Sequence, residues 1–266
     1  MEIAKPPLKS GHRLAVIDCG SNTFSLQIVD ALPGRWEEQF FMRHAVFLGR
    51  GGFKQACIMP SRFAKGIDAL RIMKQATLNY AVDEVKVIAT SVLRDASNGQ
   101  DFCDKVRDLT EWDVQIISGD QEAAWIHRGV AMTTVGLLDR HLIMDIGGGS
   151  LEFIVAESVS PKGQSKALWK QSFDAGVARL EDFGKPMDPV GQAGVERYQP
   201  FLDFTLAPLH QALKKYNPCA LVGASGSFDT FLDLVNGGRK SEVASRVNDR
   251  HPSVEVIDRD VLQGVH

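Results

Sequence analysis

Val16–Val29 reads VIDCGSNTFSLQIV, and a related stretch, MDIGGGSLEFIVAE, occupies Met144–Glu157. In each stretch an apolar, β-prone run leads into a turn of small residues and then into a second apolar run, which is typical of a β-hairpin. The two turns come into register at Asp18/Asp145, Gly20/Gly147, Ser21/Gly148, Asn22/Gly149 and Thr23/Ser150. The sequence therefore predicts an internal duplication of one hairpin.

The residue types in these turns suit a phosphate group. Small residues let the backbone approach an anion, turn N–H groups converge on it, and hydroxyl and amide side chains add donors. An Asp at the end of the preceding strand can hold a hard cation such as Mg²⁺, which makes Asp18 and Asp145 candidate metal ligands. Glu152 is a third candidate, because alternate strand residues share a face and it can face the same side as Ser150. The alternative is a structural hairpin in which each Asp hydrogen-bonds its own turn.

Predicted strands and helices alternate along the rest of the chain. The strands are predicted at 85–89, 114–117 and about 167–172, and the helices at 60–80, 97–109, 118–132, from 176 and over 191–216. Residues 220–235 are predicted as a strand, a Gly/Ser turn and a helix. Ser97 with Gln100 and Ser118 with Gln121 fit capping boxes at two helix starts. This alternation predicts an α/β fold. Because no Pro- or Ser-rich linker separates two halves, any two lobes must pack closely around one cleft.

Composition excludes several classes of protein. With 266 residues, 44% of them hydrophobic and 24% charged, the chain is an ordinary globular one and not a disordered one. The net charge of −3 gives no overall attraction to nucleic acid or to an anionic membrane. The four scattered cysteines form no CxxC pair, so neither a disulfide framework nor structural zinc is expected. No signal peptide or membrane span is evident, and a cytoplasmic protein is expected.

Five motifs in order resemble those of the Ppx/GppA phosphatases, the exopolyphosphatase and guanosine pentaphosphate phosphohydrolase family of the actin-like ATPase superfamily. They are VIDCGSNT, ATSVLRDASN, ISGDQEA, MDIGGGSLEF and VGASGS. The resemblance implies two ribonuclease H-like lobes of mixed sheets flanked by helices, at residues 1–128 and 129–266, with the active site in the cleft between them. It also implies Mg²⁺ and hydrolysis of a terminal phosphate. Family members continue beyond this sequence, so the second lobe is expected to lack its last helices.

The resemblance assigns roles to individual residues. Glu122 matches the family's catalytic carboxylate, and its place in the first turn of a helix favours the ionised form. The implied phosphate ligands are Gly20, Ser21, Asn22, Thr23, Arg94, Gly147, Gly148, Gly149, Ser150, Gly223, Ser225 and Gly226. Asp145, Glu152 and Asp18 remain the metal candidates. The chain departs from the family at Gln121, usually acidic, at Leu151, commonly Thr, and at Phe47, commonly Arg.

The sequence leaves three functions open. A Mg²⁺-dependent hydrolase acting on inorganic polyphosphate or pppGpp is favoured. An actin-like kinase or ATPase shares the paired loops, and a non-catalytic sensor that binds (p)ppGpp or polyphosphate would fit the departures from the family motifs. Both substrates present the same terminal phosphoanhydride, so the motifs do not separate them. A homodimer is a possible assembly, and neither DNA nor a membrane is expected as a partner.

Overall fold

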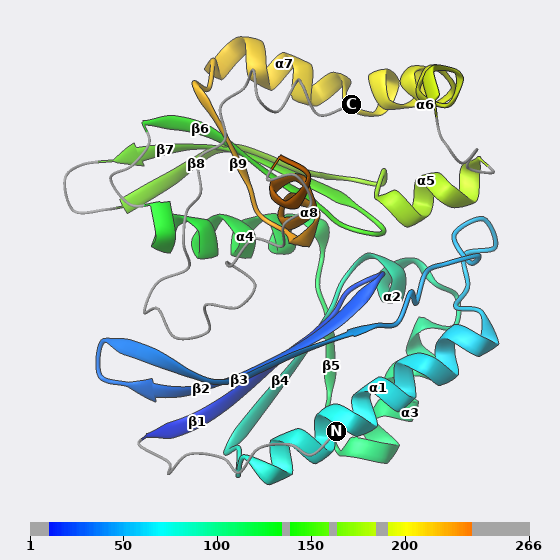
Figure 1. The fold of residues 1–266 in the computed structure, drawn as a ribbon, viewed down its shortest axis with the longest axis vertical. Helices are drawn as coiled ribbons and strands as arrows, with labels where there is room; N and C mark the ends of the chain where they lie inside the picture. Colours follow the sequence, from blue (N-terminus) through cyan, green and yellow to red (C-terminus); the bar gives the residue numbers. More distant parts are fainter. Residues whose placement is uncertain (1–10, 135–138, 160–163, 185–190, 236–266) are drawn as a thin grey trace. The chain divides into compact units, whose positions relative to one another are not determined.

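The structure is a computed structural model that describes residues 11–134, 139–159, 164–184 and 191–235 (Figure 1). It divides the chain into two compact units, each built on one β-sheet. Unit 1 comprises Met1–Ser118 and Ala175–Val195, and unit 2 comprises Gly119–Asp174 and Glu196–His266. This division differs from the predicted boundary after residue 128, because the whole helix that begins at Gly119 packs on the second sheet.

Unit 1 contains a five-stranded sheet of order β3-β2-β1-β4-β5. Its strands are β1 His12–Cys19, β2 Thr23–Leu32, β3 Arg35–Ala45, β4 Glu84–Ala89 and β5 Val114–Ile116. Its helices are α1 Pro60–Asn79, α2 Ser91–Asp95, α3 Gly99–Thr110 and α5 Val177–Phe183. β1 pairs with β2 antiparallel and with β4 parallel, so the carboxyl ends of β1 and β4 lie at the same edge of the sheet.

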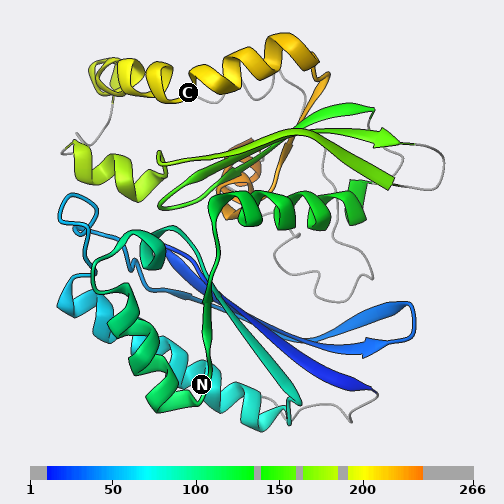
Figure 2. The ribbon, with the colours of Figure 1, turned by 180° about the vertical axis from the view of Figure 1, so that it is seen from behind.

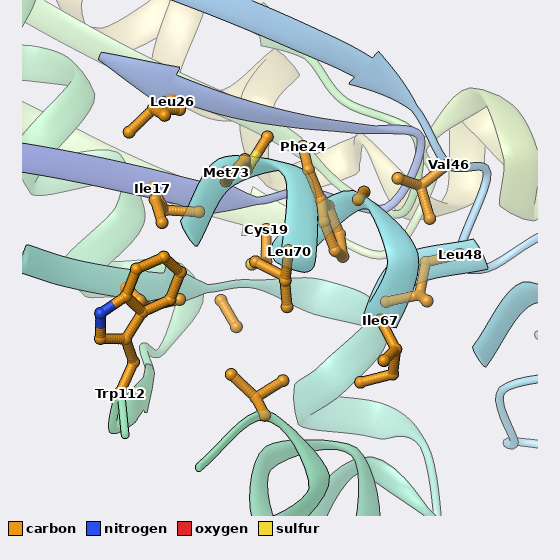
Figure 3. Close-up of a cluster of buried hydrophobic side chains, with 14 of the residues drawn as sticks. Ile17, Cys19, Phe24, Leu26, Val46, Leu48, Ile67, Leu70, Met73 and Trp112 are labelled. Carbon is orange, nitrogen blue, oxygen red and sulfur yellow. The ribbon is translucent and has the colours of Figure 1, made fainter. Parts of the chain in front are cut away.

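One face of this sheet forms the core of unit 1 together with α1 and α3. Alternate residues of β2, Phe24, Leu26 and Ile28, are fully buried, as expected for a strand with one covered face. α1 supplies Leu70 and Met73 at helical spacing from its buried stripe (Figure 3). Burial of this apolar surface fixes the strand that follows the first predicted phosphate loop.

Unit 2 contains a four-stranded sheet of order β8-β7-β6-β9. Its strands are β6 Arg140–Ile146, β7 Leu151–Val159, β8 Gln164–Phe173 and β9 Ala220–Gly223. Its helices are α4 Gly119–Thr134, most of α6 Gly191–Thr205, α7 Ala207–Tyr216 and α8 Gly226–Val235. α4 packs on β7 and β8 from one side and α7 from the other (Figure 2).

The two sheets share one plan. In each, an antiparallel hairpin carries a third antiparallel strand beside its second strand and a parallel strand beside its first. The order β3-β2-β1-β4 in unit 1 thus repeats as β8-β7-β6-β9 in unit 2. This confirms the predicted α/β fold with two sheets flanked by helices.

Several local predictions are wrong in detail. β3 and α2 were not predicted from the sequence. The helix predicted from Ser97 begins at Gly99, and no side chain caps it, because the Asn98 amide instead bonds both backbone groups of Ile58. The single helix predicted over 191–216 is two helices that meet at Leu206. Residues 236–266 lie outside the described residues, so the expected end of the second lobe is not tested.

In the part of the chain that the structure describes, no helix has the length and apolar character needed to cross a bilayer.

A buried ion pair joins the far ends of β1 and β2. Arg13 donates from Nε to Asp30 Oδ1 at 2.6 Å and from Nη2 to Asp30 Oδ2 at 2.9 Å. Both residues are at most 1% exposed, and Nη1 of the arginine also donates to the Tyr80 carbonyl at 3.0 Å. Arg13 and Asp30 are register partners, so the bidentate pair stabilises this register at the open end of the hairpin.

Asp30→Ala is expected to lower the free energy of unfolding by about 3–5 kcal/mol, since it leaves the Arg13 charge buried without its carboxylate. Urea denaturation followed by circular dichroism measures this loss. Asp68→Ala is the control, because it removes an exposed pair with Arg71 and should cost less than about 1 kcal/mol. Equal small losses for both variants would show that the buried pair does not stabilise the fold.

Candidate functional site

The loop between β1 and β2 is closed by a short-range backbone hydrogen bond. The Gly20 N–H donates to the Thr23 carbonyl at 3.1 Å. A Cβ at Gly20 would lie 2.9 Å from that carbonyl oxygen, closer than side-chain carbons approach in proteins. Asp18 lies one residue before Cys19, the last residue of β1. The first predicted phosphate loop is therefore a tight turn that requires glycine at its start.

The loop between β6 and β7 closes in the same way. The Gly147 N–H donates to the Ser150 carbonyl at 3.0 Å, and a Cβ at Gly147 would lie 2.9 Å from that oxygen. Ser150 itself is buried. The duplication predicted from the sequence thus extends to the hydrogen bond and the close approach that define each turn.

The segment that follows β3 forms backbone hydrogen bonds to the first loop. The Asn22 carbonyl accepts the N–H groups of Val46 and Phe47 at 2.9 and 2.8 Å, and the Ser21 carbonyl accepts that of Gly49 at 3.2 Å. Within the described residues, the buried Asn22 Oδ1 has no hydrogen-bond partner. An amide oxygen in this position suits a hard cation or water, and rotation of the amide would instead present N–H donors to an anion.

Asp18 has an altered pKa. The surrounding protein removes much of the water that would solvate the carboxylate, which raises the pKa of Asp18 to about 6, although the residue remains solvent-exposed. A cation bound beside this carboxyl group would stabilise its ionised form and so lower its pKa.

Asp145, Glu152 and Ser172 form a row across the sheet of unit 2. Asp145 is the register partner of Glu152, and Glu152 is the partner of Ser172, so the three side chains share one face. Glu152 is 1% exposed, and the Ser172 hydroxyl donates to its Oε1 at 2.6 Å. Two carboxylates directly opposite each other repel, and a cation between them relieves that repulsion.

Glu122 lies on the helix that covers this same face. Its neighbour Ala123 is fully buried and packs in one cluster with Ile143 and Ile154. Since strand residues alternate, these two positions share their face with Asp145 and Glu152. α4 begins at Gly119, so Glu122 lies in its first turn, where the helix dipole favours a carboxylate.

The last predicted motif supports the second loop. The Ser225 Oγ accepts the Ile146 N–H at 3.2 Å, and the Ser227 hydroxyl donates to the Ile146 carbonyl at 3.0 Å. The two hydroxyls therefore hydrogen-bond both backbone groups of Ile146, the residue that precedes Gly147. Gly223 ends β9 and Gly226 begins α8, so the motif is a strand–turn–helix beside the loop.

Arg94 lies in unit 1, on α2, which follows β4. Its Nη1 donates to the Ile117 carbonyl at 3.0 Å, and its Nε lies 3.6 Å from Asp95 Oδ1. A quarter of its side chain is exposed. Arg179 of α5 also binds the Asp95 carboxylate, at 2.6 Å.

The structure therefore groups the predicted residues by unit. Unit 1 holds Asp18, Arg94 and the loop 20–23. Unit 2 holds Glu122, Asp145, Glu152, the loop 147–150 and the motif at 223–226. Ser172 was not predicted from the sequence, because its pairing with Glu152 depends on the register between β7 and β8, which no local motif encodes.

The raised pKa of Asp18 gives a pH-dependent stability. The folded-state pKa of about 6 exceeds the ordinary aspartate value of 3.8, so protonation stabilises the folded state below pH 4, and this contribution is lost as pH rises through about 6. Asp18→Asn is therefore expected to raise the thermal midpoint at pH 7.5 and to leave it unchanged near pH 3.5, without divalent cations. Carboxyl ¹³C NMR should show the Asp18 midpoint near 6, and a midpoint at the ordinary value would contradict the assignment.

Comparison with known proteins identifies the family. The Ppx/GppA phosphatase family model matches residues 42–252. An exopolyphosphatase from Cytophaga hutchinsonii is 33% identical with a TM-score of 0.80, over 88% of this chain and 73% of that one. The fold is shared by a PPX-GPPA enzyme from Aquifex aeolicus, 24% identical with a TM-score of 0.65 over 85% of this chain and 71% of that one. It is also shared by an exopolyphosphatase-like protein, 23% identical with a TM-score of 0.73 over 85% and 70% of the two chains. The chain belongs to the Ppx/GppA phosphatase family.

Proposed function

We propose that this chain is a Mg²⁺-dependent phosphoanhydride hydrolase that removes the terminal phosphate from inorganic polyphosphate or pppGpp. The observation that carries the proposal is the pair of Asp-led loops closed by the same glycine hydrogen bond. Membership of a phosphatase family supports phosphatase chemistry, and the Cytophaga hutchinsonii relative is an exopolyphosphatase.

The residues present suit Mg²⁺. Asp145 and Glu152 offer hard oxygen ligands on one face of the sheet, and Asp18 offers another in unit 1. Over the described residues, no three or more His, Cys, Asp or Glu side chains are grouped so that they could hold a metal ion by themselves. That agrees with Mg²⁺, which commonly binds through one or two carboxylates and retains several waters. When bound, Mg²⁺ would neutralise charge on the phosphoryl oxygens.

The chain's own residues account for the remaining steps. Glu122 orients a water molecule and takes its proton as the water oxygen forms a bond to the terminal phosphorus. The bond from that phosphorus to the bridging oxygen breaks, and the shortened substrate leaves with the electron pair. The N–H groups of the loops at 20–23 and 147–150 bind the phosphate oxygens, and the Arg94 guanidinium adds a charge-assisted contact.

The test measures inorganic phosphate release from long-chain polyphosphate and, separately, from pppGpp, with Mg²⁺ and with EDTA. Glu122→Gln is expected to lower kcat by ~100-fold or more, since it removes the proton acceptor and keeps the shape. Glu37→Gln is the matched control, because Glu37 is an exposed carboxylate on β3 that pairs with Arg35.

Metal-dependent release that the Glu122 variant loses would support the hydrolase and identify its better substrate. A Glu122 variant with the wild-type rate would contradict the assigned base. Tight binding of pppGpp or polyphosphate by the wild type without any release would favour the non-catalytic sensor instead.

A further inference from the structure

We propose that Ser172 of β8 is a positioning residue that holds the start of α4, and with it Glu122, at a fixed distance from Glu152. The proposal rests on the proposed function, because it gives a role to the spacing between the candidate base and a candidate metal ligand. Three contacts, all within unit 2, carry it.

The first contact is with Glu152. The Ser172 hydroxyl donates to Glu152 Oε1 at 2.6 Å, in a site where Glu152 is almost completely buried. A hydroxyl has a single proton to donate, so this bond directs the Ser172 Oγ toward Glu152 and holds one of its carboxylate oxygens. Ser172 therefore contributes to the orientation of the Glu152 carboxylate.

The second contact is with the first residue of α4. A Cβ at Gly119 would lie 2.5 Å from the Ser172 Cβ and 2.7 Å from its Oγ. The helix start therefore rests directly on Ser172, at a distance that only glycine permits. Glu122 follows three residues later, about one helical turn along, so it moves with Gly119.

The third contact joins Lys170 of β8 to Asp120 in the first turn of α4. Lys170 lies two residues before Ser172 and so points to the same face of the sheet. Its Nζ donates to the main-chain carbonyl of Asp120 at 3.0 Å and also binds the Asp120 carboxylate. β8 thus contacts two consecutive residues of the first turn of α4.

These contacts make Ser172 the common neighbour of the candidate base helix and the candidate metal ligand. A general base works only within hydrogen-bond reach of the water it activates. A displacement of about 1 Å in such a site can cost ~100-fold in rate. Loss of a residue that orients a metal ligand typically weakens metal binding by about 10- to 100-fold.

The first test is Ser172→Ala. It is expected to weaken Mn²⁺ binding, measured by electron paramagnetic resonance without substrate, by about 10-fold or more. It should also lower kcat at saturating Mg²⁺ by about 10-fold or more. Ser172→Thr, which keeps the hydroxyl, should retain Mn²⁺ binding. Ser165→Ala is the matched control, because it removes a β8 hydroxyl bonded instead to His127 of α4, and it should change neither value.

The second test is a double-mutant cycle between Gly119→Ala and Ser172→Gly. Gly119→Ala should lower both kcat and the thermal midpoint, and Ser172→Gly should reduce the cost of Gly119→Ala by removing the atoms it strikes. Additive effects in the cycle, or a Ser172→Ala protein that binds Mn²⁺ and turns over like the wild type, would overturn the proposal.

If the wild type releases no phosphate, the proposed function fails. Mn²⁺ affinity and coupling in thermal stability then still decide the positioning role.

Discussion

A glycine N–H that bonds a carbonyl three residues later closes both loops on which the candidate site is built. At Gly20 and at Gly147 the approach to that carbonyl is too close for any side chain. The tight turn keeps the two strands of each hairpin in register up to the loop. In unit 2 that register places Asp145 directly opposite Glu152, and in both units it presents an Asp at the end of the first strand.

The shared topology of the two sheets explains why the candidate site residues lie at the carboxyl ends of strands. In open sheets with parallel strands, ligands bind beyond the carboxyl ends of the strands. β4 runs parallel to β1 and leads into α2 with Arg94, and β9 runs parallel to β6 and leads into the motif of Ser225. In unit 2, the Ala224 N–H donates to the Met144 carbonyl, which extends the pairing to the base of the loop.

The sequence predicted those features that depend on a few neighbouring residues. Both hairpins, the start of α4 at Gly119 and the glycine turns carry local signals, and the structure has them. β3 was not predicted because its residues lack a clear alternation of apolar and polar side chains. None of them is buried, as expected for an edge strand beside a bulge at Ile28/Val29. The Ser97 cap was wrong because a contact distant in sequence, between Asn98 and Ile58, decides the helix start. Ser172 shows the same limit, since the register of two strands, and not a motif, brings it to Glu152.

Direct binding measurements test whether the two glycine-closed turns bind the phosphoanhydride, as proposed. Isothermal titration calorimetry with a methylene-bridged, non-hydrolysable triphosphate analogue should show that Gly20→Ala and Gly147→Ala each weaken binding by about 10-fold or more, a loss of about 1.4 kcal/mol. Gly129→Ala on α4 is the control, because a Cβ there meets no atom within 4 Å, and it should bind like the wild type. Wild-type affinity in both loop variants, with circular dichroism unchanged, would contradict a phosphate-binding role for the two turns.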